Sequence, residues 1–232
     1  MKRSMTETEM YKADHCSARV RDMLRMFDNH DPRLPYYPLR LERNLDDLPE
    51  YALPAGYHFE NYVPGDRDTW IGIEKSAKEF STHEEGEQAW QKYYSGHESE
   101  MERRMFFVVN TDGRKVATAT AYYDVPNADD GINGWLHWVA VCREDQGHHL
   151  SKPLIVHVLS YMQSLGYRRA VVPTQTTTWL ACNVYMDLGF RPIRENAAAN
   201  RKGWEIIKTL TYHPALAEFE EADVSDYLLV HP

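Results

Sequence analysis

Through the middle of the chain, short apolar runs alternate with segments whose apolar residues have helical spacing. Runs rich in β-branched and aromatic residues favour strands, and apolar positions three or four apart favour helices. We expect strands at 57–63, 105–110, 115–124, 135–142, 169–173, 190–194 and 204–211. We expect helices at 17–28, 66–79, 150–165 and 178–188, and a further one around 89–94 within the charged stretch 83–104. This alternation predicts an α/β (α+β) fold with a mixed sheet.

Turn signals fix several boundaries. Asp112-Gly113 joins two strands as a hairpin, Pro153 occupies the tolerant first turn of a helix, and Gly166 follows that helix. Residues 36–56 are rich in proline and acidic residues and predict an irregular lead-in. The last two expected strands would form a hairpin. Three segments result: an N-terminal helical and irregular extension at 1–56, a main domain at 57–212 and an acidic tail at 213–232.

Composition narrows the class of protein. Acidic residues outnumber basic ones, 35 to 26, and the net charge of −9 disfavours nucleic acid as a partner. The three cysteines are scattered, which favours a reducing compartment. Neither a membrane span nor a secretory signal is visible, so we expect a cytoplasmic protein with no membrane partner.

One loop carries the strongest chemical signal. Gln146, Gly147, His148, His149, Leu150 and Ser151 lie between an expected strand and an expected helix. The first turn of a helix leaves backbone N–H groups unpaired, and the helix dipole adds positive potential there. The loop is therefore a candidate pyrophosphate site, although an ordinary strand-to-helix turn would have the same pattern. Gly147 suits a left-handed backbone better than His149 does.

A second segment points the same way. Asn183 and Tyr185 lie on a helix that ends before Gly189-Phe190. Together the two segments resemble the GNAT superfamily of acetyl-CoA-dependent N-acyltransferases, whose loop reads Gln/Arg-x-x-Gly-x-Gly/Ala. His149 and Ser151 stand where that family has small residues. The resemblance covers about residues 57–211 and implies a GNAT-like fold with helices on both faces of the central sheet.

The resemblance also implies roles for single residues. Tyr185 would be the general acid that protonates the leaving thiolate. Asn183 and the loop 146–151 would hold acetyl-CoA, with Val139 and Val141 on the cofactor-facing strand. The Val139 N–H would stabilise the oxyanion at a strand bulge.

The general base is the least defined residue. His137 stands near the position where the family often has a carboxylate, and a packed strand histidine is the alternative. Glu74, Glu79 and Tyr122 are fallback bases. The aromatic residues Trp90, Tyr93 and Tyr94 fit either an acceptor site or the core.

We expect no metal site. Adjacent histidines in a turn diverge, and His83, His97 and His157 have no ligand spacing with them.

The leading hypothesis is an N-acetyltransferase that moves acetyl from acetyl-CoA to a primary amine of a small molecule or peptide by direct transfer, since no cysteine has a nucleophile context. The alternative is a catalytically inactive GNAT-fold protein that binds CoA or a protein partner as a sensor or interaction module. A homodimer stays open.

Overall fold

The computed structural model describes residues 30–123, 130–195 and 198–224. The strands are β1 (Pro38–Asn44), β2 (His58–Asn61), β3 (Met105–Val109), β4 (Lys115–Tyr122), β5 (Asn133–Val141), β6 (Arg169–Gln175) and β7 (Arg191–Pro192). The α-helices are α2 (Arg67–Ser76), α3 (His83–Tyr93), α4 (Glu98–Arg104), α5 (Ser151–Ser164), α6 (Trp179–Asp187) and α7 (Ala198–Thr211). Short 3₁₀ turns lie at Arg143–Asp145, Thr176–Thr178 and Pro214–Leu216.

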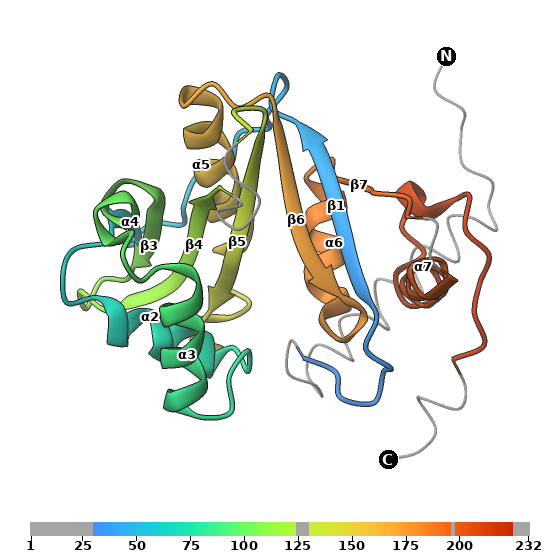
Figure 1. Cartoon of the computed structure of the whole chain (residues 1–232), viewed down its shortest axis with the longest axis horizontal. Helices are drawn as coiled ribbons and strands as arrows, with labels where there is room; N and C mark the ends of the chain where they lie inside the picture. Colours follow the sequence, from blue (N-terminus) through green and yellow to red (C-terminus); the bar gives the residue numbers. More distant parts are fainter. Residues whose placement is uncertain (1–29, 124–129, 196–197, 225–232) are drawn as a thin grey trace. The chain divides into compact units, whose positions relative to one another are not determined.

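The strands form one mixed sheet in the order β2-β3-β4-β5-β6-β1-β7 (Figure 1). Strands β2 to β5 pair antiparallel, whereas β5 and β6 pair parallel. The mixed sheet predicted from the sequence is therefore confirmed.

Helices cover both faces of the sheet, as expected. Phe106 and Phe107 follow each other on β3, so their side chains point to opposite faces. Phe106 contacts His157 and Tyr161 of α5. Phe107 instead belongs to a buried cluster with Trp70 of α2 and residues of α3. The sheet thus has one core against α5 and another against α2 and α3.

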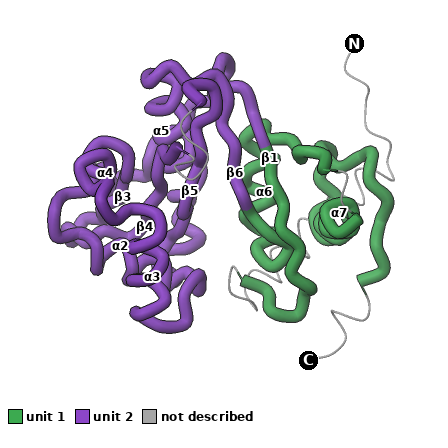
Figure 2. The backbone as a smooth tube through the Cα atoms, in the orientation of Figure 1, with its two compact units in different colours: residues 1–41, 174–232 green, residues 42–173 purple. Residues whose placement is uncertain are grey.

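The chain divides into two compact units (Figure 2). One consists of residues 42–173 and contains β2 to β5 and α2 to α5. The other consists of residues 1–41 and 174–232 and includes α6, β7 and α7. Strands β1 and β6 each contribute residues to both units.

The glycines predicted to follow helices do so. After α6, Gly189 has φ +88°, the Phe190 N–H donates to the Tyr185 carbonyl and the Gly189 N–H donates to the Met186 carbonyl. This is a Schellman motif, in which a left-handed residue reverses the chain and satisfies terminal carbonyls. Gly166 ends α5 in the same way.

Several sequence expectations were wrong. Residues 204–211 belong to helix α7, not to a strand, and β7 spans only Arg191–Pro192, so no hairpin forms. Strand β1 lies within residues 36–56, which were expected to be irregular. The charged stretch 83–104 contains two helices, α3 and α4.

The expected helix at 17–28 lies outside the described residues, and the three-segment division stays a prediction. Among the helices that the structure describes, none is long and apolar enough to cross a bilayer.

Candidate functional site

The loop between β5 and α5 has the strand–turn–helix order that the sequence predicted. Gly147 and His149 both have left-handed backbones, with φ of +82° and +59°. A β-carbon at Gly147 would meet no atom within 4 Å, so its backbone conformation, not crowding, favours glycine. His149 adopts the conformation that costs a β-carbon-bearing residue energy. The loop therefore contains strain at the position where the family has a small residue.

This loop presents unpaired donors. Within the described part of the chain, the backbone N–H groups of residues 147–151 donate to no backbone carbonyl. The 14-residue helix α5 begins at the last of these residues, Ser151, and no side chain caps its N-terminus. An anion placed there would meet aligned N–H groups and the positive end of the helix dipole.

Side chains fasten the loop to the sheet. The Gln146 amide Nε2 donates to the Val141 carbonyl at 3.1 Å, which ties the loop to the end of β5. His148 Nδ1 lies 3.0 Å from the Tyr57 hydroxyl. Arg114, next to β4, pairs with the nearly buried carboxylate of Asp145 at 2.7 Å. The contributions of Tyr57 and Arg114 could not be predicted from the sequence, because both depend on tertiary contacts.

Strand β5 is irregular beside this loop. Thr118 pairs with Ala140 and Thr120 with His137, so one residue of β4 faces both Trp138 and Val139. This is a β-bulge, and Trp138 has a left-handed φ of +49°. The pairing of β5 with β6 stops at Trp135. Val139 therefore lies in a bulged part of β5 with no β6 partner, which is the setting expected for an N–H that binds a ligand.

His137 lies in an aromatic environment. Its ring stacks on Tyr122 at 4.7 Å and contacts Tyr93, Tyr94 and Trp138 edge-on. Its Nδ1 lies 3.5 Å from the Tyr94 hydroxyl. Although part of the residue reaches the surface, loss of water around the ring lowers the pKa of His137 to about 3, and Lys92 contributes to this shift. A histidine of this basicity is a poor acceptor for an amine proton near neutral pH.

Tyr185 and Asn183 lie on α6, in the other unit. Tyr185 is buried and contacts Phe190 at 5.9 Å, while Asn183 is half-buried. On the same helix, burial raises the pKa of the Cys182 thiol to about 12. Burial also raises the pKa of Cys142. Neither thiol has the low pKa of a nucleophilic cysteine.

Among the described residues, no group of three His, Cys, Asp or Glu side chains could hold a metal ion.

Known proteins resemble this chain over much of its length. It is 28% identical over 161 residues to the mycothiol acetyltransferase of Pseudarthrobacter chlorophenolicus and 27% identical over 158 residues to that of an Arthrobacter species. Each match covers 66% of this chain and 48% of the relative, so the chain spans about half the length of these curated relatives.

Solved structures share the fold. A GCN5-related N-acetyltransferase from Sphaerobacter thermophilus aligns with a TM-score of 0.54 at 21% identity, covering 76% of this chain and 53% of that one. A GNAT-family acetyltransferase from Colwellia psychrerythraea aligns with a TM-score of 0.53 at 12% identity, covering 68% and 54%. The family model of the GNAT acetyltransferases matches residues 69–190, from α2 through the loop to the end of α6, and this chain therefore belongs to the acetyltransferase (GNAT) family.

Proposed function

We propose that this chain transfers the acetyl group of acetyl-CoA to a primary amine. The observation that carries the proposal is the run of unpaired N–H groups at residues 147–151, at the N-terminus of α5 and beside the bulged strand β5. Family membership supplies the reaction type, and the loop supplies an anion site of the kind that a pyrophosphate needs.

The residues of the loop have two roles in this proposal. Gly147, His148, His149, Leu150 and Ser151 direct backbone N–H groups to the pyrophosphate, and Gln146 holds the loop against β5 through the Val141 carbonyl. The Val139 N–H hydrogen-bonds the thioester carbonyl and stabilises the charge that develops on its oxygen. Acetyl-CoA supplies the activated acyl group and a thiolate leaving group.

Tyr185 and Asn183 complete the proposed machinery. The Tyr185 phenol protonates the departing sulfur, and the Asn183 amide contacts the cofactor. The raised pKa of both described thiols, Cys142 and Cys182, supports direct transfer to the amine over an acyl-cysteine route.

The alternative is a family member that binds CoA without catalysis. The strained His149 and the weakly basic His137 favour it, because each departs from what an efficient transferase needs at that position. Thiol release in the presence of an amine distinguishes the two functions, since a sensor would bind acetyl-CoA and release no thiol.

The test combines calorimetry with an amine panel that includes amines related to mycothiol. We expect acetyl-CoA to bind and thiol to be released with at least one amine. Ser151→Asp should weaken acetyl-CoA binding about tenfold or more, because it places a carboxylate beside the phosphates.

The matched control is Ser160→Asp, an exposed position later on the same helix α5. It adds the same charge away from the loop and should leave affinity unchanged. Equal affinity in both variants and the wild type would refute the loop as the pyrophosphate site.

A further inference from the structure

Glu74 is buried in an aromatic cluster without a partner. It lies on α2 one turn after Trp70, on the face that packs against β4 and β5. The residue is 0% exposed, and neither carboxyl oxygen has a hydrogen-bond partner within the described residues. Burying a carboxyl group without a partner is costly, so an unsatisfied one in a native core needs an explanation.

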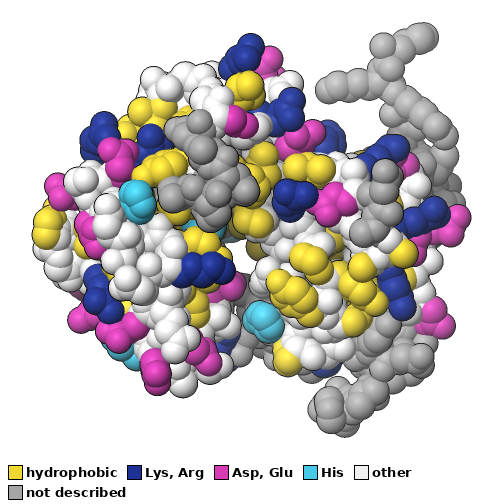
Figure 3. All heavy atoms as spheres, viewed as in Figure 1, with side chains coloured by type: hydrophobic (Ala, Val, Ile, Leu, Met, Phe, Trp, Pro, Cys, Tyr) yellow, Lys and Arg dark blue, Asp and Glu magenta, His cyan; other side chains and the backbone are white. Residues whose placement is uncertain are grey.

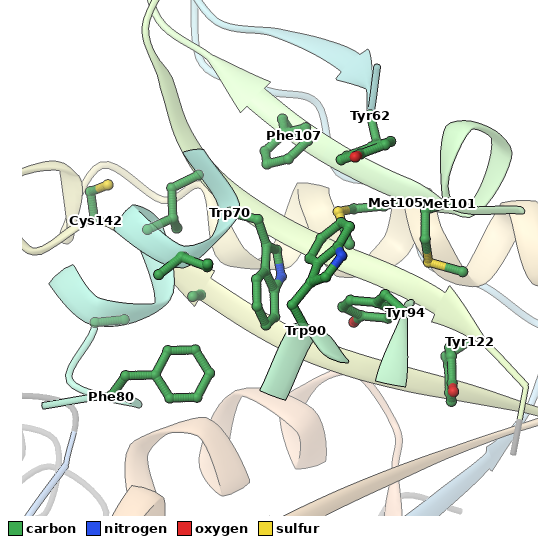
Figure 4. Close-up of a cluster of buried hydrophobic side chains, with 14 residues drawn as sticks. Tyr62, Trp70, Phe80, Trp90, Tyr94, Met101, Met105, Phe107, Tyr122 and Cys142 are labelled. Carbon is green, nitrogen blue, oxygen red and sulfur yellow. The ribbon is translucent and has the colours of Figure 1, made fainter. Parts of the chain in front are cut away.

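Half of the fourteen residues in the neighbouring buried cluster are aromatic (Figure 4). Trp70 contacts Phe80, Trp90, Tyr94 and Trp138, with ring centroids 5.3 to 5.8 Å apart. Such rings present electron-rich faces that attract cations. A carboxyl group among aromatic faces is the environment that suits an ammonium ion.

Further polar atoms in the same region are unpaired. The indole Nε1 atoms of Trp70 and Trp138 and the Thr118 hydroxyl have no hydrogen-bond partner within the described residues. Thr118 lies on the face of β4 that also presents Thr120, which accepts a hydrogen bond from Tyr94 of this cluster. A polar ligand would satisfy them.

The cluster also reaches the surface. Tyr93, Trp135 and Trp138 pack against it and are only partly buried. His137 lies among the same rings and is likewise partly exposed. Since β5 bulges at Trp138, the strand expected to face the thioester also borders the region around Glu74. Figure 3 shows Asp and Glu side chains around α2 and α3, with Lys and Arg side chains among them.

We propose that Glu74 binds the ammonium group of the acceptor and accepts its proton, so that the preferred acceptor is a cationic primary amine whose charged group fits among aromatic rings. This inference rests on the proposed acetyl transfer and names the base and the acceptor class for it.

The step balances without any further reactant. An N–H bond of the ammonium ion breaks and its proton passes to the Glu74 carboxylate. The freed amine forms an N–C bond with the acetyl carbonyl, the C–S bond breaks, and the thiolate takes a proton from Tyr185. The nitrogen loses a second proton to solvent as it becomes an amide, and the Tyr185 phenolate takes a proton from solvent. Glu74 then returns its proton to solvent. Burial raises the pKa of Glu74 well above its usual range, and Glu79 adds to this, which makes its carboxylate a stronger base than an exposed one.

Several other titratable groups lie in this region of the protein. Burial raises the pKa of Tyr94 and Tyr62 from an already high value, and His137 titrates at about 3. Cys142 has a raised pKa, and burial raises the pKa of Glu79, which lies after the C-terminus of α2. The charges of Glu79, which follows α2, and of Tyr94, at the end of α3, interact with Glu74. Tyr62, Tyr93, Tyr122 and Cys142 belong to the neighbouring cluster or pack against it, and His137 contacts its rings.

The experiment compares Glu74→Gln with the matched control Glu79→Gln in the full chain. With a cationic alkylamine, Glu74→Gln should lower kcat/KM about 100-fold and abolish the rise of kcat/KM with pH on its acid side. With hydroxylamine, whose nitrogen is largely unprotonated near neutral pH, the loss should be less than about tenfold. Acetyl-CoA affinity should not change, and Glu79→Gln should retain the acid-side rise but begin it at lower pH, because the charge of Glu79 raises the pKa of Glu74.

Each other outcome refutes the idea. Wild-type activity and pH profile in Glu74→Gln would exclude Glu74 as the base, and an equal loss with both acceptors would indicate a structural role only. Should Glu74→Gln fail to fold, Glu74→Asp must retain the acid-side pH dependence at reduced kcat, and its absence overturns the inference. A wild-type chain that binds acetyl-CoA and acetylates no amine would instead overturn the proposed function, and this inference with it.

Discussion

Replacing His149 by glycine tests the strained loop directly. His149 is exposed, has φ +59° and makes no side-chain hydrogen bond within the described residues. The substitution therefore changes the backbone preference and removes an imidazole with few contacts. His148 next to it is the matched control, since its backbone is not left-handed and its ring contacts the Tyr57 hydroxyl at 3.0 Å.

Two opposing effects determine how much the His149→Gly substitution changes the free energy of unfolding. The left-handed conformation costs a residue with a β-carbon about 1–2 kcal/mol, and glycine avoids that cost. Glycine also gains roughly 0.5–1 kcal/mol of entropy in the unfolded chain, which opposes the benefit. The net result is a stabilisation of about 0.5–1 kcal/mol at His149→Gly. At His148→Gly only the entropic cost and the lost hydrogen bond remain, so that variant should be destabilised by about 1–2 kcal/mol.

Thermal unfolding and calorimetry give the measurement. About 1 kcal/mol corresponds to about 2–4 °C in a domain of this size, so the melting temperature should rise for His149→Gly and fall for His148→Gly. Acetyl-CoA affinity should be preserved or improved in His149→Gly, because glycine lets the backbone approach the phosphates. Equal falls in melting temperature in both variants would refute the argument from strain. A stabilised His149→Gly that loses affinity would show that the imidazole itself contacts the ligand.

Two further predictions concern side chains away from the loop. Tyr185→Phe should lower kcat by about 100-fold while leaving acetyl-CoA affinity nearly intact, because sulfur charge develops only in the transition state; full turnover would remove the phenol from the mechanism. Glu74→Gln should melt at a higher temperature than the wild type in alkaline buffer. Folding raises the pKa of Glu74, so its stabilising contribution is complete below the ordinary glutamate pKa and is lost as pH rises through the raised value. The difference in melting temperature should therefore shrink on acidification, and a constant difference would contradict the raised pKa.

Local patterns predicted the elements that depend on nearby residues. The glycines after α5 and α6, the hairpin between β3 and β4, and the strand–turn–helix order of the loop follow from short-range turn and capping chemistry. Tertiary packing decided the errors. Residues 204–211 contain β-branched and aromatic residues, yet Gly203, Trp204, Ile207 and Thr211 are buried at helical spacing. A β-carbon on Gly203 would lie 2.9 Å from Leu39, so this helix depends on close approach to β1.

The candidate site likewise has features that the local sequence predicts and others that depend on tertiary packing. The loop was visible because its residues are consecutive in the sequence. The lack of a partner for Glu74 could not be predicted from the sequence. A single glutamate on an amphipathic helix gives the same pattern whether its side chain faces water or the core. Likewise, the environment that weakens His137 as a base comes from aromatic residues of three separate elements.

The position of β1 between β6 and β7 has a consequence for synthesis on the ribosome. Tyr37 hydrogen-bonds Thr176 across 139 residues of sequence, and Arg40 bonds Glu195 across 155. Strand β1 therefore leaves the ribosome long before its neighbours β6 and β7 are synthesised. Strands β2 to β5, in contrast, pair with strands that are adjacent in the sequence. Until β6 is made, the nascent β1 has no strand to pair with, and such edges are prone to aberrant association. The sheet is thus completed late, when β1 pairs with strands that are far away in the sequence. Mutations in β1 should therefore reduce the yield of folded protein more than the activity per folded molecule.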